Sequence, residues 1–95
     1  MSEQRIPVDA VLELERQYRF QFEPAQQSYV LLYPEGLIKL SGSSGEIMKR
    51  VDGNNSIEGI VRDLEQTFPG VELRQDVVDF LEVAYGKGWI RIKSN

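Results

Sequence analysis

Hydrophobic and polar residues alternate along the first half of the chain with the period of two that is typical of β-strands. In Arg19–Glu23 this alternation sets Phe20 and Phe22 on one face, which predicts a half-buried strand. A second strand is predicted at Tyr29–Tyr33, which is apolar on both faces as a central strand would be. A third is predicted at Leu37–Leu40, so that the three strands form an antiparallel meander.

The turn between the last two strands, Tyr33–Gly36, has Pro34 where a fixed φ suits the second turn position. Gly36 stands where a positive φ would close the hairpin, which predicts a type I turn with a glycine bulge. Leu37–Leu40 is the last strand of the predicted meander, and helical signals follow it directly. The outer backbone groups of that strand are therefore expected to lack a sequential partner.

The second half of the chain carries helical periodicity. A first short helix is predicted to begin at a capping box, with Ser43 as N-cap and Glu46 reaching back, and to end at Asp52-Gly53. A second helix is predicted to begin with the same pattern at Asn55 and to end at Pro69-Gly70. Its apolar positions recur with a period of about 3.6 residues, and they are Ile57, Ile60, Val61, Leu64 and Phe68.

A third helix is predicted from about Glu72 to Tyr85, and Trp89–Ile92 predicts a last short strand or a docked tail. The expected fold class is α+β: a three-stranded antiparallel β-meander, then a three-helix, winged-helix-like bundle and the C-terminal strand or tail. Residues 1–17 are expected to form an N-terminal arm, either a loose helical turn or a flexible segment, and residues 18–95 the domain proper.

The predicted third helix carries more apolar surface than a core-facing helix needs. Its core stripe consists of Leu73, Val77, Phe80 and Ala84. Val78, Leu81 and Tyr85 extend that stripe on one flank, and Val83 extends it on the other. Together the apolar sector spans roughly 220°, against somewhat over 100° in a typical case. Either this helix is the central, most buried element, or Val78, Leu81 and Tyr85 line a groove beside the third strand.

An open strand edge beside an apolar helix is what the addition of a guest strand requires. Backbone groups of Leu37 through Ser41 would pair with the guest, and the helix would offer pockets for its side chains. Lys39 is either an ordinary solvated edge lysine or a guard against unwanted pairing. It could equally meet an acidic guest.

Composition narrows the function classes. The chain has no histidine and no cysteine, which removes the commonest general base, the best nucleophile and the usual transition-metal ligands. We therefore expect no enzyme activity, no metal site and no cofactor. Gly42 and Gly45 could suggest a phosphate loop, but the start of a helix explains them. No apolar run is long enough for a membrane span, and the lack of cysteine fits the cytoplasm.

The helical outline by itself also allows a winged-helix DNA-binding protein, which we keep as the alternative function. The charge argues against it, because 15 acidic residues outnumber 11 basic ones for a net charge of −4. The predicted third helix is itself net acidic. No nucleic-acid partner is expected.

Five stretches carry a family resemblance: "YRFQFEPAQ", "VLLYPEGLIKLS", "VDG", "DVVDFLEVA" and "GWI", in this order from Tyr18 to Ile92. With them the chain resembles the PqqD family, the peptide chaperones of pyrroloquinoline quinone biosynthesis. The resemblance implies a stand-alone recognition element for a ribosomally synthesised, post-translationally modified peptide. Its implied partners are the precursor peptide PqqA and the radical S-adenosylmethionine enzyme PqqE.

In such domains the leader peptide joins the third strand and packs against the third helix. Carried onto this chain, the resemblance implies a peptide-binding site with two sides. The strand side is Leu37, Ile38, Lys39, Leu40 and Ser41, and the helix side is Val78, Leu81, Glu82 and Tyr85. A homodimer also stays open, because both faces of the predicted sheet carry apolar residues.

Overall fold

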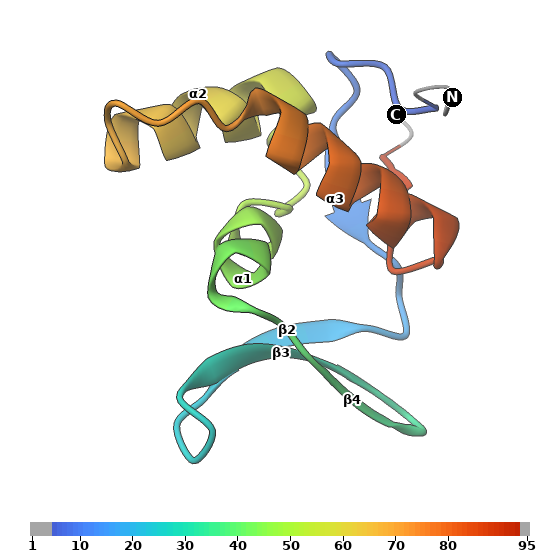
Figure 1. Ribbon diagram of the computed structural model, residues 1–95. Coiled ribbons are helices and arrows are strands. Elements are labelled where there is room, and N and C mark those ends of the chain that lie inside the picture. Colours follow the sequence, from blue (N-terminus) through green and yellow to red (C-terminus); the bar gives the residue numbers. More distant parts are fainter. Residues whose placement is uncertain (1–4, 94–95) are drawn as a thin grey trace.

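The computed structural model describes residues 5–93, and the ends of the expected arm and tail, residues 1–4 and 94–95, lie outside the described part. Residues 5–93 form two small sheets and three helices, arranged as in Figure 1. In chain order the elements are β1 (Leu12–Leu14), β2 (Arg19–Glu23), β3 (Ser28–Tyr33), β4 (Gly36–Lys39), α1 (Gly42–Lys49), α2 (Ile57–Thr67), α3 (Arg74–Gly86) and β5 (Ile90–Ile92).

The predicted meander is confirmed as an antiparallel sheet in the order β2-β3-β4. The central strand β3 contains the buried pair Val30 and Leu31, whose side chains point to opposite faces. The positive φ predicted for Gly36 is confirmed, at 158°, but the turn differs from the prediction because Gly36 pairs directly with Tyr33. This register leaves a two-residue loop with no extra residue for a bulge.

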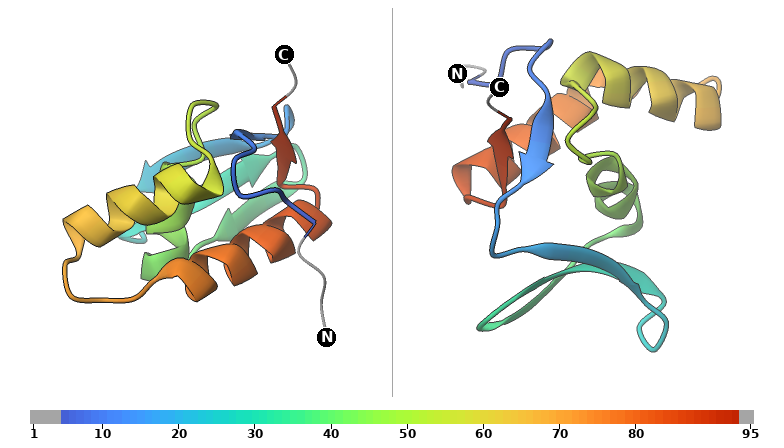
Figure 2. Two further views of the ribbon diagram at one scale, coloured as in Figure 1. Left: turned by 90° about the horizontal axis from the view of Figure 1, so that it is seen from above. Right: turned by 180° about the vertical axis from the view of Figure 1, so that it is seen from behind.

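The segment before the meander is not a helical turn where the structure describes it. β1 pairs antiparallel with β5, with Leu12 opposite Ile92, and the two strands lie side by side in Figure 2. Across this pair Arg91 Nε donates to Glu13 Oε2 at 2.7 Å. Leu12 is fully buried. The division of the chain at residue 17 stays a prediction, because it concerns whether residues 18–95 fold by themselves.

The first helix begins two residues earlier than the capping pattern predicts. Ser41, not Ser43, is the N-cap of α1, and its side chain accepts a hydrogen bond from the Ser44 N–H. Glu46 does not reach back to the start of the helix, because its carboxylate bonds to Arg50 one turn later. The expected box fails because an earlier serine with extended backbone takes the cap.

The N-cap of the second helix also differs from the predicted residue, Asn55, and lies one residue later. Ser56 caps α2 by accepting from the Gly59 N–H, while the Asn55 side chain donates instead to the Arg50 carbonyl. α3 has no side-chain cap at Leu73. The terminal strand predicted within Trp89–Ile92 is confirmed as β5.

One hydrophobic core joins both sheets and all three helices. In Figure 1, α1 lies between the meander and the α2–α3 pair. Close approach of α1 to β3 requires Gly45, since a Cβ there would lie 2.7 Å from Tyr29 Cδ2. The core consists of Ile6, Leu12, Leu31, Leu40, Ile47, Met48, Val51, Ile57, Ile60, Val61, Leu64, Val77, Leu81, Ala84 and Ile90.

Candidate functional site

β4 is an edge strand within the part of the chain that the structure describes, because it pairs with β3 alone. The phase of its hydrogen bonds follows from one contact: the Leu40 N–H donates to the Tyr29 carbonyl at 3.0 Å. Hydrogen-bonded and non-hydrogen-bonded pairs alternate along an antiparallel ladder. Leu31 and Ile38 therefore form the next hydrogen-bonded pair, and the outward groups of the edge are the N–H and C=O of Leu37 and Lys39.

The open edge ends where α1 begins. The Ser41 carbonyl accepts the Gly45 N–H at 2.7 Å, and the Ser41 side chain caps the helix. Leu40 is only 4% exposed and belongs to the core. Of the five residues expected on the strand side, Leu37 and Lys39 thus offer backbone groups along the edge. Ile38 is half-buried against the core.

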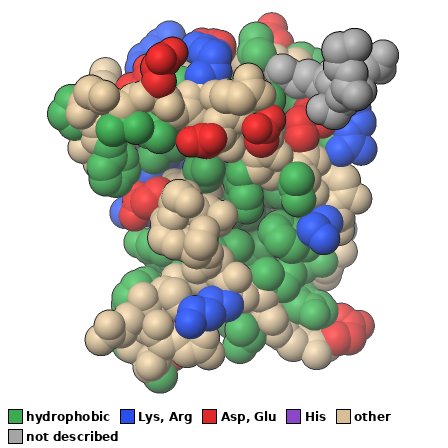
Figure 3. All heavy atoms as spheres, viewed as in Figure 1, with side chains coloured by type: hydrophobic (Ala, Val, Ile, Leu, Met, Phe, Trp, Pro, Cys, Tyr) green, Lys and Arg blue, Asp and Glu red, His purple; other side chains and the backbone are tan. Residues whose placement is uncertain are grey.

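Apolar side chains gather between the open strand and α3. Figure 3 shows a hydrophobic surface between α3 and the meander below it. The bordering elements carry partly buried side chains that pack on the core, among them Ile38 on β4, Phe80 on α3 and Trp89 beyond it. The Phe80 and Trp89 rings lie 6.5 Å apart between centroids. A strand added to β4 would therefore meet apolar surface on its inner face.

The helix-side residues expected from the sequence lie in different environments. Leu81 is fully buried, so it supports the core rather than a surface groove. The Glu82 carboxylate accepts the backbone N–H groups of Arg5 and Ile6, each at 2.8 Å. The Arg5 guanidinium lies over the Tyr85 ring, 5.3 Å from its centroid. Glu82 and Tyr85 thus hold the chain's own N-terminal segment, and whether a peptide also contacts them stays a prediction.

The flank of α3 that carries Phe80 faces away from the N-terminal segment and toward α1. Phe80 and Glu82 are about 160° apart around the helix axis at about 100° per residue. Phe80, Asp76 and Leu73 lie toward the start of α1, where they line a groove with Gly42 and Ser43. Val78, for its part, is half-buried against the core. Periodicity identified the wide apolar sector but could not say which flank faces the strand.

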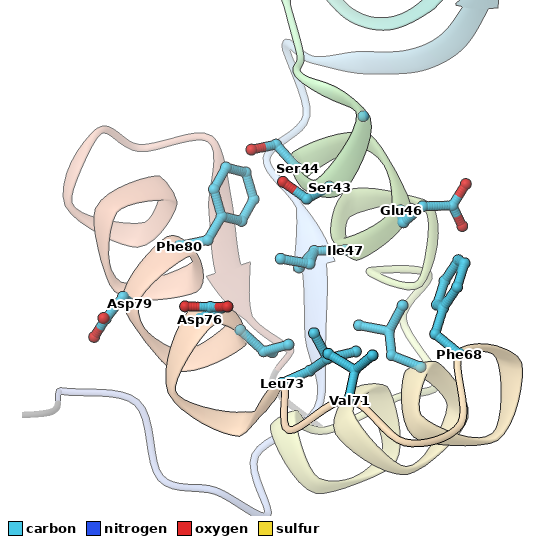
Figure 4. Close-up of a pocket in the computed structure, with 13 residues that line it drawn as sticks. Ser43, Ser44, Glu46, Ile47, Phe68, Val71, Leu73, Asp76, Asp79 and Phe80 are labelled. Atoms are coloured by element: carbon cyan, nitrogen blue, oxygen red, sulfur yellow. The ribbon is translucent and has the colours of Figure 1, made fainter.

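This groove has a volume of about 750 Å³ and lies between the start of α1, the end of α2 and the first half of α3 (Figure 4). The sequence reasoning missed it. The available signal was the apolar content of a turn: Phe68 and Val71 flank Pro69-Gly70 and are 42% and 51% exposed. The groove lining is Gly42, Ser43, Ser44, Glu46, Ile47, Leu64, Phe68, Val71, Leu73, Asp76, Val77, Asp79 and Phe80.

Other kinds of site find no support in residues 5–93. No group of three or more acidic side chains in this range is arranged to hold a metal ion. No helix in the same range combines the length and the apolar character that crossing a membrane would take. The geometry that the described residues do offer is an open backbone edge beside apolar surface, which suits an extended polypeptide.

Comparison with known proteins points in the same direction. The family model described as "Coenzyme PQQ synthesis protein D (PqqD)" matches residues 28–90. A "PqqA binding protein" of Pseudomonas paraeruginosa is 49% identical over 87 residues, which are 90% of this chain and 95% of that protein. A "PqqA binding protein" of Acinetobacter baumannii is 44% identical over 91 residues, which are 95% of this chain and 97% of that protein.

A solved structure is similar over almost the whole chain. It is the solution NMR structure of the PqqD truncation of Methylobacterium extorquens PqqCD, described as a functional, stand-alone RiPP recognition element. The TM-score is 0.75 and the sequence identity 26%, over 93% of this chain and 96% of that chain. This likeness confirms the predicted α+β fold class.

Proposed function

This chain belongs to the PqqD family, and from that premise we propose that it is a peptide chaperone of pyrroloquinoline quinone biosynthesis. It binds the precursor peptide PqqA by strand addition to β4 and presents the peptide to the radical S-adenosylmethionine enzyme PqqE. The binding role is supported by relatives that carry the name "PqqA binding protein". The delivery step rests on the family resemblance.

The observation that carries the strand-addition mechanism is the outward direction of the Leu37 and Lys39 backbone groups. These groups stand in register on a strand whose other side is already bonded to β3. A precursor peptide loses conformational entropy when it is ordered, and a preformed edge lowers that cost because its partners are already aligned. The apolar surface between β4 and α3 would then receive every second side chain of the guest.

Delivery to PqqE would work through effective concentration. A peptide held on the chaperone encounters the enzyme together with it, so that the second binding step becomes partly intramolecular. The chemical step is assigned to PqqE, and we propose that the chain itself acts without catalysis and without a cofactor. We place it in the cytoplasm because the proposed guest is a ribosomal product.

The DNA-binding alternative is disfavoured by the charges on α3. The basic residue of this helix, Arg74, is bonded to Glu58 on α2. The remaining charged residues of α3 are Asp76, Asp79 and Glu82, which would repel phosphate groups. A helix of this kind does not resemble one that enters the major groove with basic and amide side chains.

The proposed mechanism is tested by calorimetric titration of PqqA into three proteins: the wild type, Lys39→Pro and Lys39→Ala. Proline removes the outward N–H while the inner ladder stays intact, since an edge strand tolerates proline on its open side. Lys39→Ala keeps the N–H and removes only the charged side chain. We expect Lys39→Pro to weaken binding about tenfold, the equivalent of about one backbone hydrogen bond.

Lys39→Ala is expected to bind PqqA within about twofold of the wild type, as befits an exposed side chain. Circular dichroism verifies that both variants fold. Equal affinity of folded Lys39→Pro and wild type would exclude strand addition at β4, while a lack of PqqA binding by the wild type would exclude the function. Sedimentation of the same samples shows whether two copies of the chain associate and so compete with the peptide.

A further inference from the structure

We propose that the groove between the three helices is a second subsite for the guest, which binds a short apolar segment that carries a lysine or arginine. The inference rests on the proposed function, because it assigns the occupant to the same peptide that pairs with β4. It adds a recognition element that strand addition lacks, since backbone pairing carries little information about the guest's side chains.

The floor of the groove is apolar and accessible. Ile47 of α1, Leu64 of α2 and Val77 of α3 form its inner surface. Toward solvent it is bordered by Phe68 and Val71, two of the most exposed large hydrophobic side chains among the described residues. Figure 4 shows side chains of all three helices converging on one space. Burying such a surface under a guest side chain is favourable by about 25 cal/mol per Å² of apolar area.

The rim of the groove is acidic. Its ionisable residues are Glu46, Asp76 and Asp79, and neither lysine nor arginine is part of the lining. Glu46 is paired with Arg50, and Asp79 accepts a hydrogen bond from Gln75. Asp76 makes no ion pair within residues 5–93. The groove therefore combines an apolar floor with a rim on which Asp76 and Asp79 have no ion-pair partner among the described residues, and this is complementary to an apolar segment with a positive charge.

Two arginines on the helices around the groove are already paired with acidic residues. Arg74, at the start of α3, is held by Glu58 in the first turn of α2. Arg50 is bound by Glu46 and Asp63 and is 11% exposed. The groove lining therefore offers a guest lysine or arginine carboxylates and no ammonium or guanidinium group of its own.

The position of the groove connects it to the open edge. Its lining begins at Gly42, three residues after Lys39. A guest paired antiparallel with Leu37–Lys39 would run toward Gly42 with the residues that precede its paired segment, about three residues or 10 Å upstream. The basic, apolar segment is thus expected on the N-terminal side of the strand-forming residues.

The test compares PqqA with a PqqA shortened from its N-terminus up to the strand-forming residues. Binding is measured by calorimetry for the wild type, for the double variant Asp76→Asn, Asp79→Asn, and for the control Glu65→Gln. Glu65 is an exposed acid on α2 that is not part of the groove lining. The double variant is expected to bind full PqqA about three- to tenfold more weakly at low ionic strength, since two partly exposed ion pairs are lost.

Three further results are expected. At high salt the difference between the double variant and the wild type disappears, because the rim charges are screened. The shortened peptide binds the wild type more weakly than full PqqA does. It binds the wild type and the double variant with equal affinity. Val71→Ser, which removes apolar surface at the border of the groove without changing charge, weakens the binding of full PqqA but not that of the shortened peptide. Thermal unfolding verifies that each variant is folded, as expected for exposed positions.

The groove assignment is overturned if the double variant and Val71→Ser both bind full PqqA as the wild type does while Lys39→Pro still binds it more weakly. That result would leave the proposed function intact. Methyl NMR gives an independent outcome: the Val71 and Leu73 methyl signals should shift with PqqA alone. A shift only on addition of PqqE would make the groove an enzyme-docking surface and contradict the assignment. A wild type that fails to bind PqqA would remove both proposals.

Discussion

The carboxylate of Glu82 binds the backbone of Arg5, 77 residues earlier in the chain, through an N–H to Oε2 distance of 2.8 Å. The same oxygen accepts the next backbone N–H, and the Arg5 side chain donates from Nε to Oε1 at 3.1 Å. The Glu82 side chain is 17% exposed, so these bonds are partly shielded from water. This relationship fixes the N-terminal segment along the C-terminal half of α3.

Removing this carboxylate should loosen the segment. Glu82→Gln is expected to lower the free energy of unfolding by about 1–3 kcal/mol, because charge-assisted bonds to two backbone N–H groups are weakened together. Urea unfolding measures the change. Glu65→Gln, on an exposed face of α2, serves as the control and should change stability by less than about 0.5 kcal/mol. Equal midpoints for the two variants would show that the contact contributes nothing.

Ile6 tests whether the N-terminal segment belongs to the folded domain. Its side chain is 1% exposed and part of the core. Ile6→Ala should cost about 2–5 kcal/mol of unfolding free energy, since it leaves a cavity in packed surroundings. The matched control is Val8→Ala, because Val8 is 41% exposed. If both substitutions cost little, the segment behaves as an independent arm, as the division at residue 17 predicts.

Arg50 joins α1 to α2. Its Nη1 donates to the Glu46 carbonyl at 2.7 Å and to Glu46 Oε1 at 2.9 Å, while Nε bonds to Asp63. Burial lowers the pKa of Arg50, but the hydrogen bonds to both carboxylates outweigh it, so that the pKa lies above its usual value. Arg50→Met should destabilise the fold by about 1–3 kcal/mol.

For a domain of this size, that loss corresponds to a melting temperature lower by about 4–8 °C per kcal/mol. Differential scanning calorimetry measures it. The control is Arg62→Met on the same helix as Asp63, since Arg62 is exposed. A melting temperature for Arg50→Met that matches the control would refute the bridging role.

The stabilisation by the ion pair between Glu58 and Arg74 should depend on pH. The hydrogen bond from Arg74 lowers the pKa of Glu58 from its usual value of 4.5. Because the folded-state pKa is depressed, the stabilisation is present above the unfolded pKa and disappears as the pH falls through the lower, folded pKa. The urea midpoint of the wild type should therefore exceed that of Glu58→Gln at pH 6, and the difference should shrink as the pH is lowered below 4.5. A difference that is constant with pH would contradict the pairing.

The strands of the meander could be predicted from sequence because alternation reports the two faces of a sheet directly. Arg19–Glu23 was predicted with its observed bounds, and the other two strands were located to within a residue. β1 could not be found in this way. It has three residues, and its partner β5 comes 76 residues later, so only tertiary pairing defines it.

The helix starts and the site show a second kind of limit. Several serines close together each satisfy a capping pattern, and the backbone conformation of Ser41 decides between them. The edge strand was recognisable because helical periodicity, and no further strand of the meander, follows it directly. Which of its backbone groups face outward depends on the phase of the ladder, which the Leu40 to Tyr29 bond fixes in the structure. Likewise, helical periodicity cannot assign the two flanks of α3 to the N-terminal segment and to the groove.

The most direct measurement for strand addition at β4 is amide hydrogen exchange by NMR, residue by residue, without and with PqqA. In the free chain the Ile38 and Leu40 amides should exchange slowly, because they are bonded to β3, while the Leu37 and Lys39 amides should exchange fast. Addition of PqqA should slow exchange at Leu37 and Lys39 and leave Ile38 and Leu40 nearly unchanged. Saturating PqqA that leaves the Leu37 and Lys39 amides exchanging as fast as before would contradict strand addition at this edge.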